Sequence, residues 1–171
     1  MNKPHQNISI NKVNCAIITI SDTRDFDSDK SGQLIRDLLV KQSHDINFYQ
    51  IIKDNSDEIK LLLNTLIEQS NIDVIVCNGG TGISHRDNTY DVISQLLDKT
   101  LSGFGEIFRY LSYQEIGSRA IASRAVAGVY QGKIIFSLPG STGAVKLGME
   151  QLILPELTHL VSHISENFSS N

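Results

Sequence analysis

Four polar or glycine-rich segments follow predicted strands and carry residue types that are used in phosphate and metal chemistry. They are Ser21-Asp22, Asp54, Gly79-Gly80-Thr81-Gly82 with Asp87 after it, and Gly140-Ser141-Thr142-Gly143. Because the carboxyl ends of parallel strands meet at one edge of a sheet, we expect these segments to converge there. The sequence therefore predicts a ligand site built from Asp, Ser, Thr and Gly at this edge.

The glycine segment Gly79–Gly82 has the composition of an anion-binding loop. Glycine lets backbone N–H groups approach a ligand closely, and Thr81 adds a hydroxyl donor. The alternative is an ordinary tight turn between a strand and a helix. Ser141 and Thr142 precede a helical segment and form a second candidate anion site, for which the alternative is N-capping.

Asp54 and Asp87 follow different strands and can meet at the same edge, with Asp22 near by. Paired carboxylates beside a phosphate repel the ligand unless they share Mg²⁺, which bridges carboxylate and phosphate oxygens. The combination points to phosphoryl or nucleotidyl transfer. For Asp54 the alternative is helix capping. Arg86 can pair with Asp87 or contact a phosphate, or it can be a solvated loop arginine.

Strands and helices alternate along most of the chain, which indicates an α/β fold with a mainly parallel sheet between helix layers. Apolar patterns predict strands at 13–20, 46–53, 73–77, 125–130 and 133–138. The last two flank Gln131-Gly132 as a hairpin with one antiparallel arm. Helical spacing predicts helices at 30–42, 55–67 and 89–97, and on both sides of Pro155. We expect Ser102–Glu106 to interrupt the chain before a further helix that ends at Ile116.

Length and composition indicate a single globular domain over residues 1–171, with polar, flexible ends at about 1–10 and 166–171. The net charge of −4 disfavours nucleic acid as a partner. Cys15 and Cys77 lie in apolar runs and are expected to be reduced core thiols. The sequence contains neither a membrane span nor a secretory signal, so a cytoplasmic location is expected.

Several familiar catalytic motifs are absent from the sequence. There is no G-x-G-x-x-G after the first strand, and the glycines before Lys133 are spaced wrongly for a P-loop. The G-x-S-x-G elbow of serine hydrolases is missing too. His159 and His163 lie four residues apart but lack a third ligand, and no structural metal is expected.

Five motifs in this order resemble the MoaB and MogA family of molybdenum cofactor biosynthesis proteins. They are Ser21-Asp22-Thr23, Asn78–Gly82 with Arg86–Thr89, Gly103–Glu106, Ser123-Arg124-Ala125 and Leu138–Ser141. The resemblance extends from Val13 to Leu157, and 108–112 and 139–145 look closer to the MoaB branch.

The resemblance implies a three-layer α/β/α domain that binds molybdopterin, a pterin carrying a dithiolene and a phosphate. In active relatives Mg-ATP adenylylates that phosphate. Asp54 and Asp87 occupy the positions of two essential aspartates and are the candidate Mg²⁺ ligands, and Ser123 matches a serine of the same site. The resemblance also implies a trimer or hexamer, with other molybdenum cofactor enzymes as candidate partners. Tyr110 and Tyr113 would suit its interface, as would Phe104 and Phe108 if these two are not in the core.

Two functions follow from this resemblance. The first is a molybdopterin adenylyltransferase, because Asp54, Asp87, Arg86 and the glycine loop are present. The second is a non-catalytic molybdopterin-binding or carrier protein, because Gly140–Gly143 replaces the Gly-Asn-Pro or Gly-Gln-Pro of many adenylyltransferase members. Ser102 and Tyr90 also replace common prolines, at positions that tolerate the change. A nucleotide-binding protein with another substrate is a third, remote alternative.

Overall fold

A six-stranded sheet with the order β2-β1-β3-β6-β5-β4 forms the centre of the molecule in the computed structural model, which describes residues 11–168. The strands are β1 (Asn14–Ile20), β2 (Asp45–Ile52), β3 (Val74–Asn78), β4 (Lys99–Thr100), β5 (Val126–Tyr130) and β6 (Lys133–Leu138). The β1, β2, β3 and β6 strands pair in parallel, and β5 runs antiparallel to both β6 and β4. The predicted parallel sheet with one antiparallel hairpin arm is confirmed, whereas β4 was not predicted.

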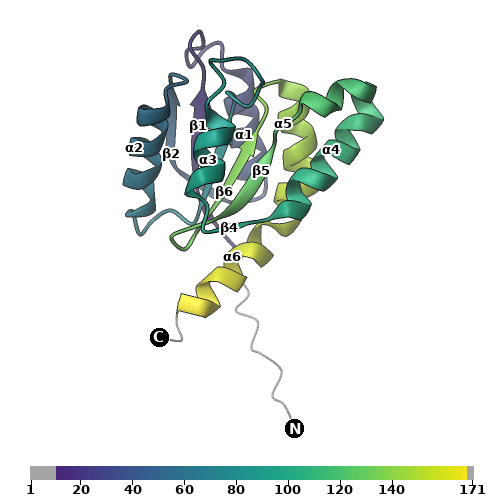
Figure 1. Cartoon of the computed structure of the whole chain (residues 1–171). Coiled ribbons are helices and arrows are strands. Elements are labelled where there is room, and N and C mark those ends of the chain that lie inside the picture. The colour runs from purple at the N-terminus through teal and green to yellow at the C-terminus, as the bar shows by residue number, and fades with distance from the viewer. Residues whose placement is uncertain (1–10, 169–171) are drawn as a thin grey trace.

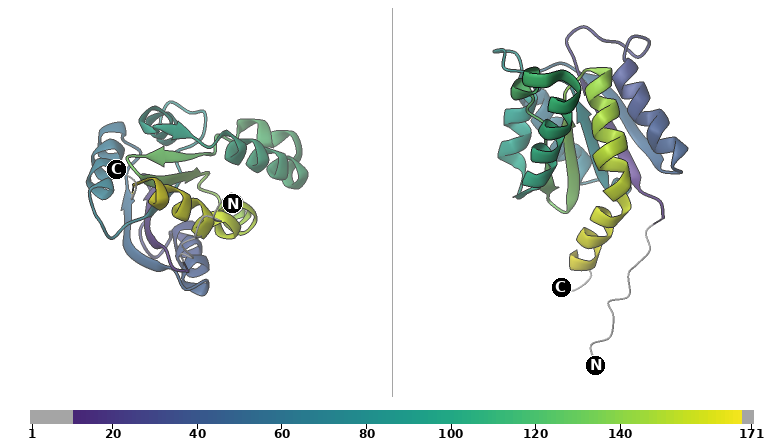
Figure 2. Two further views of the ribbon diagram at one scale, coloured as in Figure 1. Left: turned by 90° about the horizontal axis from the view of Figure 1, so that it is seen from below. Right: turned by 90° about the vertical axis from the view of Figure 1, so that its right-hand side faces the viewer.

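Helices cover both faces of the sheet, as Figures 1 and 2 show. They are α1 (Lys30–Lys41), α2 (Ser56–Ile67), α3 (Thr89–Leu96), α4 (Ser102–Ile116), the 3₁₀ helix η1 (Gly117–Ala122), α5 (Thr142–Gly148), the π-helical turn η2 (Met149–Ile153) and α6 (Leu154–Phe168). The α2 and α3 helices pack on one face, and α1, α5 and α6 pack on the other. This arrangement is the three-layer α/β/α fold that the resemblance implied.

The central strand β1 joins the two halves of the core, because successive side chains of a strand point to opposite faces. Cys15 and Ile17 pack with the helix layer of α1, and Ala16 and Ile18 pack with the layer of α2. Cys15 and Cys77 are both fully buried and free, and burial raises the pKa of each thiol to about 12. The prediction that both lie in the core is confirmed, and neither forms a disulfide bond.

Side chains cap the starts of two helices. The Asp29 carboxylate accepts a hydrogen bond from Gly32 N at the start of α1. The Asn55 side chain accepts bonds from the N–H groups of Asp57 and Glu58 at the start of α2. Pro155 is the second residue of α6, directly after the π-helical turn in a continuous helical run from Thr142 to Phe168, and proline and π turns are both common where a helix bends.

The predicted interruption at Ser102–Glu106 is wrong, because α4 begins at Ser102 and runs through this segment. Gly105 in this segment has a packing role. A Cβ at Gly105 would lie 2.8 Å from the carbonyl oxygen of Ala125, so glycine lets α4 approach the strand β5 closely.

Residues 1–10 and 169–171, where flexible ends were expected, lie outside the described residues, and 166–168 continue α6. The described end of α6 projects beyond the sheet in Figure 1. Over residues 11–168, the structure contains no helix with the length and apolar character of a membrane span.

Candidate functional site

The loops that follow β1, β3 and β6 meet at one edge of the sheet and enclose a cavity of about 410 Å³. Convergence at this edge was the central prediction from the sequence, and the structure confirms it. The predicted residues that line the cavity are Ser21, Gly79, Gly80, Thr81, Gly82, Asp87, Ser123, Gly140 and Ser141. The loop after β2 reaches the same edge through Asp54, which lies beside the cavity.

The glycine loop has a backbone that other residues rarely adopt, since φ is +101° at Gly79 and +63° at Gly80. A Cβ at Gly79 would lie 2.2 Å from the carbonyl oxygen of Ile20, so the loop is pressed against the end of β1. Gly79 N already donates to Leu138 O at 3.0 Å. This first N–H therefore holds the loop to β6 and is engaged before any ligand binds.

Asp54 lies against the glycine loop, next to Gly80. Its Oδ2 is 2.4 Å from the position that a Cβ of Gly80 would take, so only glycine fits there. Its Oδ1 accepts a hydrogen bond from Asn88 N at 3.0 Å. Burial raises the pKa of Asp54, and the negative charges of Asp87 and Asp22 add to this rise, while the bonds from Asn88 oppose it.

Asp87 flanks the other end of the same loop. Its Oδ2 accepts a bond from Ser84 N at 2.8 Å and lies 2.6 Å from the Cβ position of Gly82. The structure thus brings Asp54 and Asp87 to the two ends of one three-residue segment, Gly80–Gly82. The cap of α2 is Asn55 and not Asp54, so the capping alternative for Asp54 is wrong.

Besides Asp54, three predicted residues lie outside the cavity wall. Asp22 is exposed and accepts a hydrogen bond from Asp54 N at 3.2 Å, which ties the first two strand-end loops together. Arg86 is exposed, and among the ion pairs of residues 11–168 none joins it to Asp87. Thr142 is the first residue of α5. Its neighbour Ser141 caps that helix by accepting a bond from Ala144 N at 3.3 Å, as the capping alternative expected.

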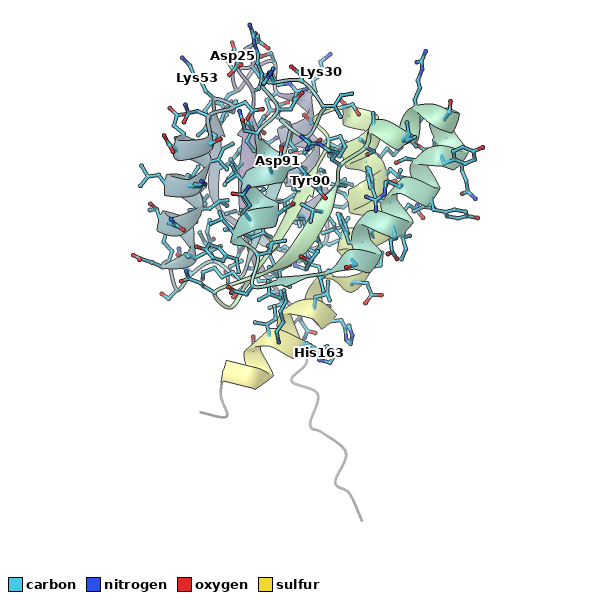
Figure 3. All side chains as sticks on the ribbon, viewed as in Figure 1. Asp25, Lys30, Lys53, Tyr90, Asp91 and His163 are labelled. Atoms are coloured by element: carbon cyan, nitrogen blue, oxygen red, sulfur yellow. The ribbon has the colours of Figure 1, made fainter. Side chains whose placement is uncertain are left out.

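Arg124 belongs to the motif Ser123-Arg124-Ala125, but it was not predicted to be a site residue. Its guanidinium donates to the carbonyl oxygens of Thr81 at 3.1 Å, Asp87 at 3.2 Å, and Gly82. It also pairs with Asp91 at 3.0 Å, and its Cζ lies 4.8 Å from the centre of the Tyr90 ring. Tyr90 and Asp91 are labelled at the start of α3 in Figure 3. Arg124 therefore fixes the far side of the glycine loop, next to Ser123 in the cavity wall.

Two further arginines line the cavity, Arg24 from the loop after β1 and Arg119 from η1. Neither belongs to a sequence pattern that would have identified it. They add positive charge to a cavity whose other lining residues are acidic or neutral. Within residues 11–168 no group of three or more His, Cys, Asp or Glu side chains forms a ready metal site.

Comparisons with known proteins show the family to which this chain is similar. A profile of the family described as "Probable molybdopterin binding domain" matches residues 16–159. Molybdenum cofactor biosynthesis protein B from Halalkalibacterium halodurans is 53% identical over 161 residues, which cover 94% of this chain and 95% of that protein.

Two solved structures share the fold over most of the chain. One is described as molybdenum cofactor biosynthesis protein B and has a TM-score of 0.88 at 47% identity, covering 91% of this chain and 97% of that chain. The other is a tungsten cofactor synthesizing protein MoaB from Pyrococcus furiosus, with a TM-score of 0.81 at 41% identity, covering 90% and 97%. By sequence and by structure, this chain belongs to the molybdopterin-binding family of molybdenum cofactor biosynthesis protein B.

Proposed function

We propose that this chain acts in molybdenum cofactor biosynthesis, binds molybdopterin in the cavity at the sheet edge, and adenylylates its phosphate with Mg-ATP. Family membership supports the pterin ligand. The observation that carries the transfer reaction is the placement of Asp54 and Asp87 at the two ends of the loop segment Gly80–Gly82. Carboxylates beside an N–H-rich loop suit a reaction between two phosphate-bearing ligands.

The two aspartates fit a magnesium ion. Mg²⁺ in nucleotide sites is bound by one or two carboxylates together with substrate phosphates and retains several waters, so it needs no third protein ligand. We propose Asp54 and Asp87 as its carboxylate ligands. When bound, the ion would neutralise the negative charge of the phosphate groups that meet during transfer.

The chain's own residues position the reactants. In adenylyl transfer a phosphate oxygen of the pterin bonds to the α-phosphorus of ATP, and pyrophosphate leaves. Thr81 and Ser123 supply hydroxyl groups in the cavity wall. Arg124 keeps Thr81, Gly82 and Asp87 in place through their carbonyl oxygens. Such fixed donors accelerate transfer by orientation and by preorganised electrostatics.

The second candidate function is a non-catalytic molybdopterin carrier. The segment Gly140–Gly143 favours it, because its sequence departs from that of many adenylyltransferase members and Ser141 serves as a helix cap. A carrier would use the same cavity for the pterin but would not need a nucleotide. Binding of ATP therefore separates the two functions.

Calorimetric titration with ATP and Mg²⁺, with and without molybdopterin, tests the proposal. We expect ATP to bind the wild-type protein and the affinity to fall in Asp87→Ala. Pterin binding without any nucleotide binding would support the carrier. A protein that binds no pterin would contradict both functions and would favour a nucleotide-binding protein with another substrate.

We also propose that the chain forms a homo-oligomer through α4 and η1. Phe108 is fully buried and Phe104 packs against it and against Phe136, so these two phenylalanines belong to the core. Tyr110 and Tyr113 are each 62% exposed on α4. Ile121 on η1 is 91% exposed, which is unusual for a large apolar side chain unless a partner covers it.

A further inference from the structure

Arg24 connects two loops that come from strands that are not neighbours. Its Nη2 donates to the carbonyl oxygen of Gly140 at 2.8 Å, and its Nη1 donates to Ser31 Oγ at 2.5 Å. In the sheet, β3 lies between β1, which precedes Arg24, and β6, which precedes Gly140. The guanidinium group therefore crosses the end of β3 in the wall of the cavity.

The buried carboxylate of Asp29 forms an ion pair with Arg24 and fixes its position. Asp29 is completely buried, and its Oδ1 lies 3.6 Å from Arg24 Nη1. Its Oδ2 accepts a hydrogen bond from the Tyr49 hydroxyl at 2.6 Å. Burial raises the pKa of Tyr49, and Asp29 raises it further, so the phenol remains a donor. Asp29 is closed off from the cavity and can act on a ligand only by fixing Arg24.

The Arg24 side chain retains donors for a ligand. A guanidinium carries more N–H groups than the two that Ser31 and Gly140 receive, and the side chain is 31% exposed where it lines the cavity. An arginine that served only to neutralise Asp29 would not need to face the cavity. Arg119, an exposed residue of η1, lines the same cavity and adds a second cation.

The positively charged Arg24 and the negatively charged Asp54 and Asp87 lie over different helix layers of the fold. Asp29 and Ser31, which hold Arg24, lie at the start of α1 on one side of the sheet. Asp54 and Asp87 precede α2 and α3, which pack on the other side. The label of Asp25, next to Arg24 in the chain, marks this loop at the sheet edge in Figure 3. The cavity thus has a cationic side and an acidic side.

We propose that Arg24, fixed by Asp29 and assisted by Arg119, binds a phosphate group of a ligand on the cationic side of the cavity. This proposal rests on the proposed function and extends it with a specific anion-binding residue. Arginine suits the task because its planar fork makes paired hydrogen bonds to phosphate oxygens. The phosphate can belong to the pterin or to ATP, and binding experiments distinguish these two sources.

The test compares Arg24→Gln and Arg24→Lys with the wild type and with Arg36→Gln as the matched control. Arg36 is an exposed arginine of α1 that pairs with its neighbour Asp37 and does not line the cavity, so its loss removes the same charge. Calorimetric titrations use molybdopterin, its dephosphorylated form, Mg-ATP and inorganic pyrophosphate. Thermal melting checks that each variant is folded, and Arg24→Lys preserves a cation beside Asp29 if the Gln variant is unstable.

We expect both Arg24 variants to lose roughly 10- to 100-fold in affinity for one phosphate-bearing ligand, while Arg36→Gln binds normally. A loss for molybdopterin that disappears with the dephosphorylated pterin would assign the site to the pterin phosphate. A loss confined to Mg-ATP and pyrophosphate would assign it to the nucleotide. Folded Arg24 variants with wild-type affinity for all four titrants would overturn the proposal. If the wild type binds neither molybdopterin nor ATP, the proposed function fails, and pyrophosphate binding alone decides whether Arg24 holds an anion.

Discussion

Asp54 is a partly buried carboxylate, and its burial lowers the stability of the folded protein when the side chain is charged. The chain surrounds it with Gly80, Asn88 and a second carboxylate at Asp87, so that its charge is partly removed from water. A partly buried carboxylate is more stable with a bound cation than as an unpaired charge. The raised pKa of Asp54 follows from this burial and from the neighbouring negative charges of Asp87 and Asp22.

This pKa leads to a stability prediction for Asp54→Asn. Because burial raises the pKa of Asp54 above its ordinary value of 3.8, the folded protein holds the proton more tightly than the unfolded chain. The stability contributed by Asp54 is therefore present at low pH and is lost as the pH rises through the folded pKa. We expect Asp54→Asn to raise the Tm at pH 7 by a few degrees, with the gain disappearing toward pH 3. Melting curves across this range check it, and an equal or lower Tm at pH 7 would contradict the account.

Some site residues were predictable from the sequence and others were not. Asp54, Asp87 and the glycine loop directly follow strands, so local pattern and the geometry of a parallel sheet placed them. Arg24 and Arg124 act across long sequence separations, on Gly140 and on Thr81. An arginine side chain reaches far from its own backbone, and no spacing rule says which loop it will contact.

The glycine loop is the element on which the site depends most directly. In Gly80→Ala the new Cβ would lie 2.1 Å from Thr89 Oγ1, at a positive φ that alanine disfavours. We expect it to lower the free energy of unfolding by about 2–4 kcal/mol and to weaken ligand binding. Chemical denaturation measures the first effect and calorimetry the second.

Gly103→Ala is the matched control for this substitution. Gly103 lies in the first turn of α4 with open space around its Cβ position. We expect this variant to change stability by less than about 1 kcal/mol, in the stabilising direction, and to bind ligand normally. Equal effects of the two substitutions would show that the loop has no special requirement for glycine.

Among the helices and strands, the long strands and most helices were predicted from the sequence, because the periodicity of their apolar residues is clear. It missed β4, since a strand of two residues carries no period. It also interpreted Ser102–Glu106 as a break, because glycine is unfavourable in helices. Close packing of Gly105 against β5 compensates for that preference, and such packing is visible only in three dimensions.

For the whole molecule, the exposed apolar residues of α4 and η1 indicate an interface between subunits, and the family resemblance implies a trimer or hexamer. We expect the wild type to be a trimer or hexamer by light scattering and Ile121→Glu to dissociate it, because a buried unpaired charge is costly. Val40→Glu, at a separate exposed apolar position on α1, should leave the assembly intact. A monomeric wild type would contradict this interface. The cytoplasmic location and the absence of nucleic acid as a partner stay predictions.

A turnover assay with molybdopterin, Mg²⁺ and ATP labelled at the α-phosphate tests the proposed adenylyl transfer directly. We expect the wild type to form a labelled, adenylylated pterin and to release pyrophosphate, and we expect Asp54→Asn and Asp87→Asn to remain folded but to form none. If the folded wild-type protein binds both ligands at saturation and yields no adenylylated pterin, the proposed transfer is contradicted, and the chain is a molybdopterin carrier.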